Sequence, residues 1–218
     1  ESQKQAQALA PGAAQQQDKP SFVKVSPFND YRLEGLKMDP PKELCPHILV
    51  AHETTILFSG PGVGKTALAT QIAFELAEQG MRVLVVNFEL SQQQLALRYP
   101  NKEFPNTLYH ASIDYTKMHD VTDQNLILPE IERLAVERNI ELIIIDNFTN
   151  LCINSKEAAE AGNIMVKLLA MRMTHNWTML ILAHVPKRKQ GDPLTIDDLA
   201  GSKLLSNLAD NVIGFNKS

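Results

Sequence analysis

This 218-residue chain has few cysteines, no long apolar run and only a small excess of negative charge. The two cysteines, Cys45 and Cys152, stand far apart without metal-ligand spacing, so we expect reduced thiols and neither a zinc site nor a disulfide framework. The longest apolar runs, 142–145 and 177–183, are far shorter than the roughly 20 residues that cross a bilayer. The formal net charge of −4 excludes an overall field that would attract nucleic acid or an anionic membrane.

What remains is the composition of an ordinary globular protein, with 44% hydrophobic residues. The length suits one large α/β domain with a sizeable core. No signal peptide pattern is visible, so we expect a cytoplasmic protein with no membrane partner. The chain begins at Glu1 and not at Met, which is what a fragment of a longer protein would show.

The first 30 residues are predicted to be a low-complexity tail or linker, followed by a folded domain over 31–218. Residues 1–19 are rich in Gln and Ala and have few large apolar side chains to bury. Because Ala and Gln also favour helices, a helix that docks on a partner is the alternative. Five prolines between residues 20 and 50 predict an extended lead-in to the domain.

Residues 54–67 carry the most informative pattern in the chain. Ile56, Leu57 and Phe58 predict a buried strand, a glycine-rich turn follows, and Gly64-Lys65-Thr66 opens a helix. Glycines let backbone N–H groups surround a phosphate, and the helix N-terminus adds positive potential at the same place. The predicted nucleotide-binding residues are Ser59, Gly60, Pro61, Gly62, Val63, Gly64, Lys65, Thr66 and Ala67.

This P-loop departs from the strict pattern G-x-x-x-x-G-K-[ST] at its first position, where Ser59 replaces glycine. The context still supports the motif, because a strand precedes it and apolar residues at helical spacing follow it, with Gly80 as a helix stop. A glycine turn that binds no ligand is the alternative. Lys65 is expected to reach the β- and γ-phosphates of ATP, and Thr66 to place its hydroxyl on Mg²⁺.

From about residue 47, apolar strands alternate with helices. This alternation predicts the α/β class, with a mostly parallel central sheet covered by helices on both faces. Ligands of such sheets bind at the carboxyl ends of the strands. The predicted strands are 56–58, 83–88, 108–111, 142–145, 178–183 and 212–215, and the predicted helices begin near Lys65 or cover 91–99, 123–138 and 156–175.

Two carboxylates directly follow predicted strands. Asp146 comes after a β-branched run and is expected to hold Mg²⁺ beside Thr66. Glu89 follows the strand 83–88 and is expected to be the catalytic base that accepts a proton from an attacking water. The plainer alternatives are a turn or helix-cap aspartate and a glutamate that favours the N-terminus of the next helix.

His184 follows the strand 178–183 and is expected to sense the γ-phosphate, although a histidine at a strand end is often only structural. The densest basic cluster of the chain comes next and contains Lys187 and Arg188. Together with Lys203, these are the candidates for contact with DNA or with a neighbouring subunit's ATP. The cluster lacks an aromatic residue for base stacking, and a solvated charge run is the alternative.

These motifs together resemble the RecA-like ATPase core, in the branch of the DnaB-type and RepA-type hexameric replicative helicases. The resemblance covers about residues 50–215 and extends to ATPases of bacterial plasmids and mobile elements. It rests on the segments 88–91 (Phe-Glu-Leu-Ser), 143–147 (Ile-Ile-Ile-Asp-Asn), 183–184 (Ala-His), 198–202 (Asp-Leu-Ala-Gly-Ser) and 208–210 (Leu-Ala-Asp).

The resemblance implies that the strand before His184 lies between the P-loop strand and the Asp146 strand. It also implies ATP bound at subunit interfaces, with a finger residue from the neighbouring subunit. The sequence departs from both types here, because it ends at Ser218, before a DnaB-type Lys-x-Arg pair, and has Ala200 where RepA-type proteins have arginine. The domain therefore resembles one that lacks its last C-terminal strands.

Three functions remain open at this stage. The first is a Mg²⁺-dependent ATPase stimulated by single-stranded DNA, acting in replication or mobilisation as a helicase or loader, and assembled as a homo-oligomer that is a hexamer if it follows that branch. The second is a nucleotide-gated regulator that binds a protein and has little turnover. The third is a small-molecule kinase, which Glu89 at a strand end argues against.

Overall fold

The computed structural model describes residues 23–117, 126–152, 158–185, 194–199 and 203–216. The chain divides into two compact units between Pro40 and Pro41. The described part of the first unit contains helix α1 (Phe28–Gly35), and the second unit contains every other element. No helix in the described residues is both long enough and apolar enough to span a membrane.

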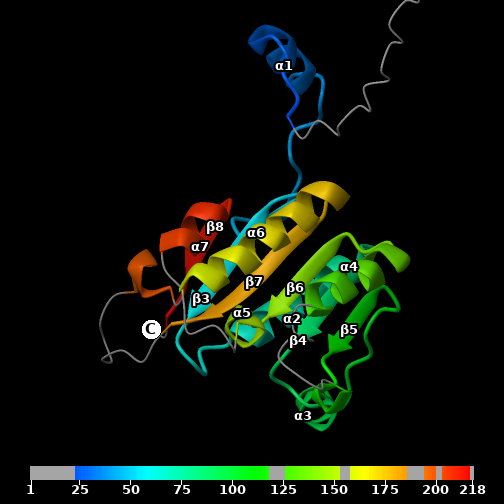
Figure 1. Ribbon diagram of the computed structural model, residues 1–218. Coiled ribbons are helices and arrows are strands. Elements are labelled where there is room, and N and C mark those ends of the chain that lie inside the picture. Colours follow the sequence, from blue (N-terminus) through cyan, green and yellow to red (C-terminus); the bar gives the residue numbers. More distant parts are fainter. Residues whose placement is uncertain (1–22, 118–125, 153–157, 186–193, 200–202, 217–218) are drawn as a thin grey trace, which may run out of the picture. The chain divides into compact units, whose positions relative to one another are not determined.

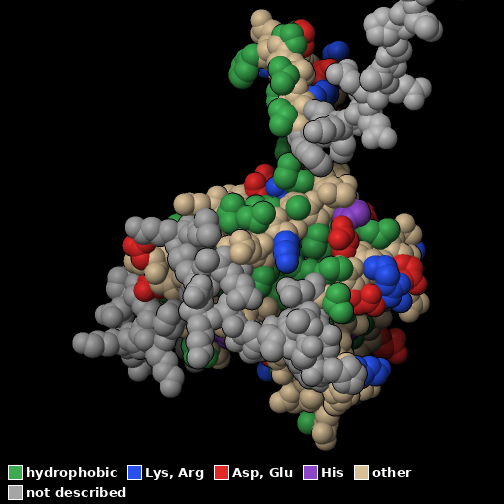
Figure 2. Space-filling view, in the orientation of Figure 1, with side chains coloured by type: hydrophobic (Ala, Val, Ile, Leu, Met, Phe, Trp, Pro, Cys, Tyr) green, Lys and Arg blue, Asp and Glu red, His purple; other side chains and the backbone are tan. Residues whose placement is uncertain are grey.

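Helix α1 buries none of its residues. Figure 2 shows hydrophobic side chains on the surface of this segment, and seven large ones are exposed: Val23, Val25, Phe28, Tyr31, Leu33, Leu36 and Met38. The prediction of an extended lead-in over residues 20–50 is wrong at this helix. The prolines flank it at positions 27 and 40 and do not interrupt it, so every residue inside α1 keeps its backbone donor.

The second unit begins with an antiparallel hairpin of β1 (Glu43–Cys45) and β2 (Leu49–Val50). Its main feature is a six-stranded sheet in the order β5-β4-β6-β7-β3-β8, in which every neighbouring pair is parallel (Figure 1). The predicted α/β class with a parallel sheet is confirmed. The strands are β3 (Thr54–Ser59), β4 (Val83–Asn87), β5 (Leu108–Ser112), β6 (Leu142–Asp146), β7 (Thr178–His184) and β8 (Asn211–Gly214).

Both faces of this sheet are covered, because alternate residues of each strand point to opposite sides. In β6, Leu142 and Ile144 pack with the apolar side of α2 (Lys65–Glu78), whereas Ile143 and Ile145 pack with the helices of the other face. Those helices are α4 (Ile127–Glu137), α5 (Phe148–Leu151), α6 (Ala158–His175) and α7 (Lys203–Leu208) (Figure 1). Burial on both sides explains why the strands read as continuous apolar runs.

The helix boundaries follow local signals. Ser91 caps α3 (Gln92–Arg98) through a reciprocal capping box with Gln94, and Gly80 takes a φ of +94° two residues after α2. Pro129 lies in the first turn of α4, where its missing N–H has no intrahelical acceptor to lose. Sequence patterning missed the short elements α5, α7, η1 (Tyr115–Lys117) and η3 (Ile196–Asp198), which hold too few residues to show a helical period.

Strand β7 lies between β3 and β6, as the resemblance to RecA-like ATPases implies. In register, His184 at the end of β7 stands beside Ser59 at the end of β3, and Asp146 stands beside Asn87 at the end of β4. Four consecutive strands of the sheet therefore deliver polar residues to one edge.

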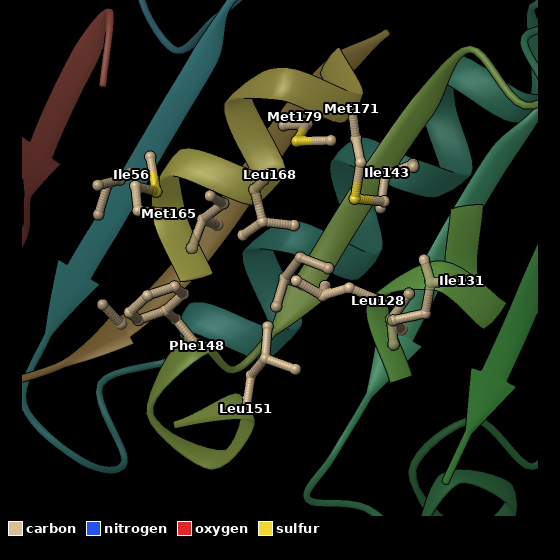
Figure 3. Close-up of a cluster of buried hydrophobic side chains, with 14 of the residues drawn as sticks. Ile56, Leu128, Ile131, Ile143, Phe148, Leu151, Met165, Leu168, Met171 and Met179 are labelled. Carbon is tan, nitrogen blue, oxygen red and sulfur yellow. The ribbon is translucent and has the colours of Figure 1, made fainter. Parts of the chain in front are cut away.

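The core beneath α6 is the main apolar contact of one sheet face. Figure 3 shows Met165 and Leu168 of α6 among Ile56, Met179 and Ile143 of the sheet. Met165 is fully buried, whereas Met173, two turns further along the same helix, is 74% exposed. The two methionines therefore differ in burial although they are the same type of residue in the same helix.

We predict that Met165→Ala lowers the free energy of unfolding by about 2–5 kcal/mol, because it removes buried apolar volume and leaves a cavity. Met173→Ala should change it by less than about 0.5 kcal/mol, since that side chain is already in solvent. Urea unfolding followed by circular dichroism measures both. Equal losses for the two variants would contradict the placement of α6 on the sheet.

Candidate nucleotide site at the carboxyl edge of the sheet

A cavity of about 270 Å³ opens at the carboxyl edge of the sheet. It lies where the chain leaves β3, β7, β6 and β4, the four neighbouring strands whose polar ends were predicted to meet. Its walls combine the glycine turn and the first residues of α2 with side chains from the other three strand ends and from α3. The lining residues are Gly62, Gly64, Lys65, Thr66, Ala67, Glu89, Arg98, Asp146 and His184.

The turn between β3 and α2 has the backbone that a phosphate loop requires. Gly62 and Gly64 have φ values of +68° and +114°, in the left-handed region that L side chains rarely adopt. Gly64 caps α2, so the first backbone N–H groups of a 14-residue helix face the cavity end of the turn. The loop therefore supplies donors for an anion.

Lys65 is buried to 6% exposure at the base of this loop. Its Nζ donates to the carbonyl oxygens of Ser59 and Gly60 at 2.8 and 3.1 Å, and to the Ser59 hydroxyl at 3.2 Å. Burial lowers the pKa of the Lys65 ammonium, and the carboxylates of Glu89 and Asp146 partly oppose that shift. Because all three acceptors are neutral, a phosphate oxygen would be a stronger partner for this cation. The hydroxyl of Ser59, which the glycine of the strict motif would lack, is therefore one of the three acceptors that hold Lys65.

Asp146 is 4% exposed and accepts a hydrogen bond from the Thr66 hydroxyl. Burial raises the pKa of the Asp146 carboxyl and nearby Glu89 adds to the rise, against the opposing effects of the Thr66 hydrogen bond, His184 and Lys65. The structure brings together the two oxygen donors predicted to hold Mg²⁺. No cluster of three or more His, Cys, Asp or Glu that could hold a metal occurs among the described residues.

Glu89 is held from two sides. Its Oε1 accepts hydrogen bonds from the Asn147 side-chain amide and from Nε2 of His184, the latter at 2.8 Å. Nδ1 of His184 is buried and has no hydrogen-bond partner in the described part of the chain. The predicted base and the predicted sensor are therefore in direct contact.

Asn87 organises the turn that carries Glu89, a role that sequence reasoning missed. Its Oδ1 accepts from the backbone N–H groups of Glu89 and Leu90 at 2.8 and 2.9 Å, while its Nδ2 donates to Leu90 O at 3.0 Å and lies 3.2 Å from Nε2 of His110. Burial lowers the pKa of His110, which favours the neutral ring that can accept this hydrogen bond. An asparagine at a strand end is the signal that could have identified this role, because such residues form hydrogen-bonded turns.

Asn147 and Arg98 were also missed. Asn147 is fully buried, and its Oδ1 caps α5 by accepting from Asn150 N at 3.0 Å while its Nδ2 holds Glu89. Arg98 reaches the cavity from the last turn of α3. Of the predicted basic residues, Lys187 and Arg188 lie outside the described residues, and of Lys203 only the backbone, at the start of α7, is described.

A family model described as an AAA domain matches residues 19–190. The chain belongs to this AAA domain family. DNA repair protein RadA from Synechocystis sp. is 30% identical over 172 residues, which cover 73% of this chain and 32% of that protein. RadA from Campylobacter jejuni is 26% identical over 174 residues, which cover 77% of this chain and 34% of that protein. The chain thus spans about a third of the length of these curated relatives.

The fold is similar to that of a solved structure. The crystal structure of the KaiC-like protein PH0186 from Pyrococcus horikoshii superposes with a TM-score of 0.62 at 16% identity, covering 80% of this chain and 81% of that one. The fold is that of a RecA-like P-loop ATPase. The comparisons support the RecA-like ATPase group as a whole and do not single out the DnaB and RepA helicase branch.

We predict that Asp146→Asn stabilises the fold in the absence of added Mg²⁺. The raised pKa means that the folded chain binds the Asp146 proton more tightly than the unfolded chain does. The stability of the wild type therefore falls as pH rises through the aspartate range to the raised folded pKa, and the asparagine variant escapes that loss.

Urea unfolding at pH 4, 6 and 8 measures this effect. The advantage of the asparagine variant should grow with pH and then level off. Asp197→Asn, on an exposed turn, should shift stability by less than about 0.5 kcal/mol. An Asp146→Asn variant that is less stable than the wild type at pH 8 would show that the Thr66 hydrogen bond outweighs the burial cost.

Proposed function

We propose that this chain binds ATP with Mg²⁺ and hydrolyses it, and that DNA stimulates the reaction. The observation that carries the proposal is the meeting of Lys65, Thr66, Asp146, Glu89 and His184 around one cavity beside a glycine turn. These residues come from four separate strand ends, and each has a part in phosphoryl transfer to water.

Lys65 and the loop N–H groups would bind the β- and γ-phosphates. On binding, Nζ would exchange its neutral acceptors on Ser59 and Gly60 for phosphate oxygens. Thr66 and Asp146 would hold Mg²⁺, since hydroxyl and carboxylate oxygens are the ligands it prefers and such sites usually combine one or two carboxylates with substrate phosphates. Mg²⁺ would supply charge neutralisation on the phosphate oxygens.

Glu89 would act as the base. Its carboxylate would take a proton from a water as that water's oxygen bonds to the γ-phosphorus and the bond to the bridging oxygen of ADP breaks. Asn147 and His184 hold Oε1 of Glu89, and Asn87 fixes the turn that carries it. These contacts orient the base before substrate arrives, which lowers the entropic part of the barrier.

His184 would link the chemistry to the rest of the chain. Because its Nε2 already bonds Glu89, a γ-phosphate that competes for either group would change this contact. The residue also begins the connection that leads away from β7 toward residues 186–193. A two-state hydrogen bond of this kind is how a nucleotide state is passed to a distant segment.

We predict that Glu89→Gln keeps ATP affinity within about threefold of the wild-type value and lowers kcat by about 10²–10⁴-fold, because the amide cannot accept the proton. Glu78→Gln, at the far end of α2 and about 20 Å along the helix from the P-loop, is the matched control and should leave both values unchanged. Phosphate release and nucleotide titration measure the two quantities. An unchanged kcat in Glu89→Gln would rule out Glu89 as the base.

The proposed DNA link draws support from the relatives, which are named as DNA repair proteins. We propose a homo-oligomeric ATPase that acts on single-stranded DNA as a helicase or loader, the role that the DnaB-type and RepA-type resemblance implies. Since the chain has a net charge of −4, DNA contact would come from a local basic patch, for which Lys187, Arg188 and Lys203 remain the candidates.

We predict that single-stranded DNA raises ATP turnover at saturating Mg²⁺ by about tenfold or more, and that ATP with DNA increases the size of the protein in solution. Turnover with and without a dT oligonucleotide, together with light scattering on a sizing column, measures both. Sequence-independent binding should weaken as salt rises, because phosphate contacts release counterions. Turnover and size that both ignore DNA would remove the helicase or loader role.

The exposed apolar side chains of residues 23–38 favour one alternative, a nucleotide-gated regulator that binds a protein through this segment. Nucleotide-dependent binding of a protein partner without turnover would select it.

A further inference from the structure

Arg98 lines the nucleotide cavity, yet neither the P-loop pattern nor the strand-end pattern includes it. It lies nine residues after Glu89, in the last turn of α3, and its side chain is exposed. Every other cavity residue belongs to the P-loop segment or to a strand end. Arg98 therefore contributes a cation to this site from a different element.

Its guanidinium group is uncommitted within the described part of the chain. Of the five arginines described in the second unit, Arg82, Arg133, Arg138 and Arg172 each donate to a carbonyl or a carboxylate. The guanidinium group of Arg98 makes no hydrogen bond or ion pair with the described residues, although Glu89 and Asp146 line the same cavity. An arginine beside a cavity with its five donors unused is available for a ligand.

The helix that carries Arg98 is fixed at both ends, so the backbone of Arg98 has a defined position in the fold. The capping box of Ser91 and Gln94 sets its start. At its end, the Tyr99 ring meets Phe104 edge-to-face with centroids 5.5 Å apart, and Phe104 meets Phe74 of α2 at 5.9 Å.

A cation–π contact adds to this anchor. Lys102 Nζ lies 3.6 Å from the centroid of the Phe74 ring and 3.3 Å from the Gln71 side chain, both on α2. The segment after Arg98 is therefore tied to the helix that begins with the P-loop. This tie holds the Arg98 backbone at a set place relative to Lys65.

The charged residues that line the cavity leave a role for Arg98 as a second cation. Lys65 is the other cation among the lining residues, and it stands against two carboxylates, Glu89 and Asp146. The γ-phosphate of ATP would bring further negative charge close to both carboxylates. The planar fork of an arginine matches two phosphate oxygens at once, and a cation placed there stabilises the charge that spreads over the γ-phosphate oxygens during transfer.

We propose that Arg98 binds the γ-phosphate of ATP within its own subunit and makes the site prefer ATP to ADP. The proposal rests on the proposed function, because it assigns Arg98 a ligand of the same cavity. Lys65 would then bind the phosphates from the β3 side and Arg98 from the β4 side. A cation that holds only the γ-phosphate has no partner once that group has left.

Binding of ADP and of a non-hydrolysable ATP analogue, measured by calorimetry on the whole chain with Mg²⁺, tests this assignment. Arg98→Ala should weaken binding of the ATP analogue by about 10–100-fold, as expected for the loss of a charged hydrogen-bonded contact, and change ADP affinity by less than about twofold. Arg98→Lys should restore part of the loss, because it returns the charge without the fork. Arg133→Ala, on the solvent-exposed face of α4, is the matched control and should bind both nucleotides as the wild type does.

Equal weakening for both nucleotides would place Arg98 on the α- or β-phosphate or on the base and overturn the proposal, as would no weakening at all. Should Arg98→Ala fail to fold, Arg98→Lys decides by the same comparison of the two nucleotides. A wild-type chain that binds neither nucleotide would overturn the proposed function itself. A wild type that binds both, with variants that keep its preference for ATP, would overturn the role of Arg98 alone.

Discussion

The parallel pairing of four neighbouring strands is the constraint on which the rest of the site depends. Parallel strands end at the same edge, so β3, β7, β6 and β4 deliver the P-loop, His184, Asp146 and Glu89 to one place. The pairing is held by side chains buried on both faces of the sheet. A slip of one residue in any of these strands would turn its apolar set to the wrong face and move its terminal polar residue out of the site. The strand register that packs the core is therefore the same register that places the polar residues in the site.

The site is also a balance of buried charge. Lys65 and Asp146 are both nearly inaccessible to water, and burial shifts the pKa of each toward its neutral form. Hydrogen bonds from Thr66 to Asp146 and from Lys65 to the loop carbonyls oppose this cost. A metal nucleotide would supply both partners that these charges lack, a cation for Asp146 and phosphate oxygens for Lys65. Without a ligand, the buried charges of Lys65 and Asp146 therefore lower the stability of the fold. Such a loss of stability is common at functional sites.

The fold could be predicted to a large extent from the sequence, and so could the meeting of Lys65, Asp146, Glu89 and His184 at one edge of the sheet. Continuous apolar strands alternating with helices are a local signal that length and periodicity reveal, and a polar residue at the end of such a strand is visible by position alone. The misses were of another kind. Helix α1 follows a proline and was read as extended, and α5 and α7 are too short to show a period. Asn87 and Asn147 act through hydrogen bonds to a residue brought near by folding, which no spacing reveals.

By itself the sequence determined that the chain has a phosphate loop in an α/β domain, because glycines, a lysine and a threonine between a strand and a helix have that chemistry wherever the rest of the chain lies. Only the tertiary structure decided which other residues share the cavity. Glu89 contacts His184 across 95 positions of sequence, and Arg98 enters because its helix is anchored to α2 by aromatic contacts. Such contacts depend on sheet order and helix packing, and these are properties of the whole chain that no single segment contains.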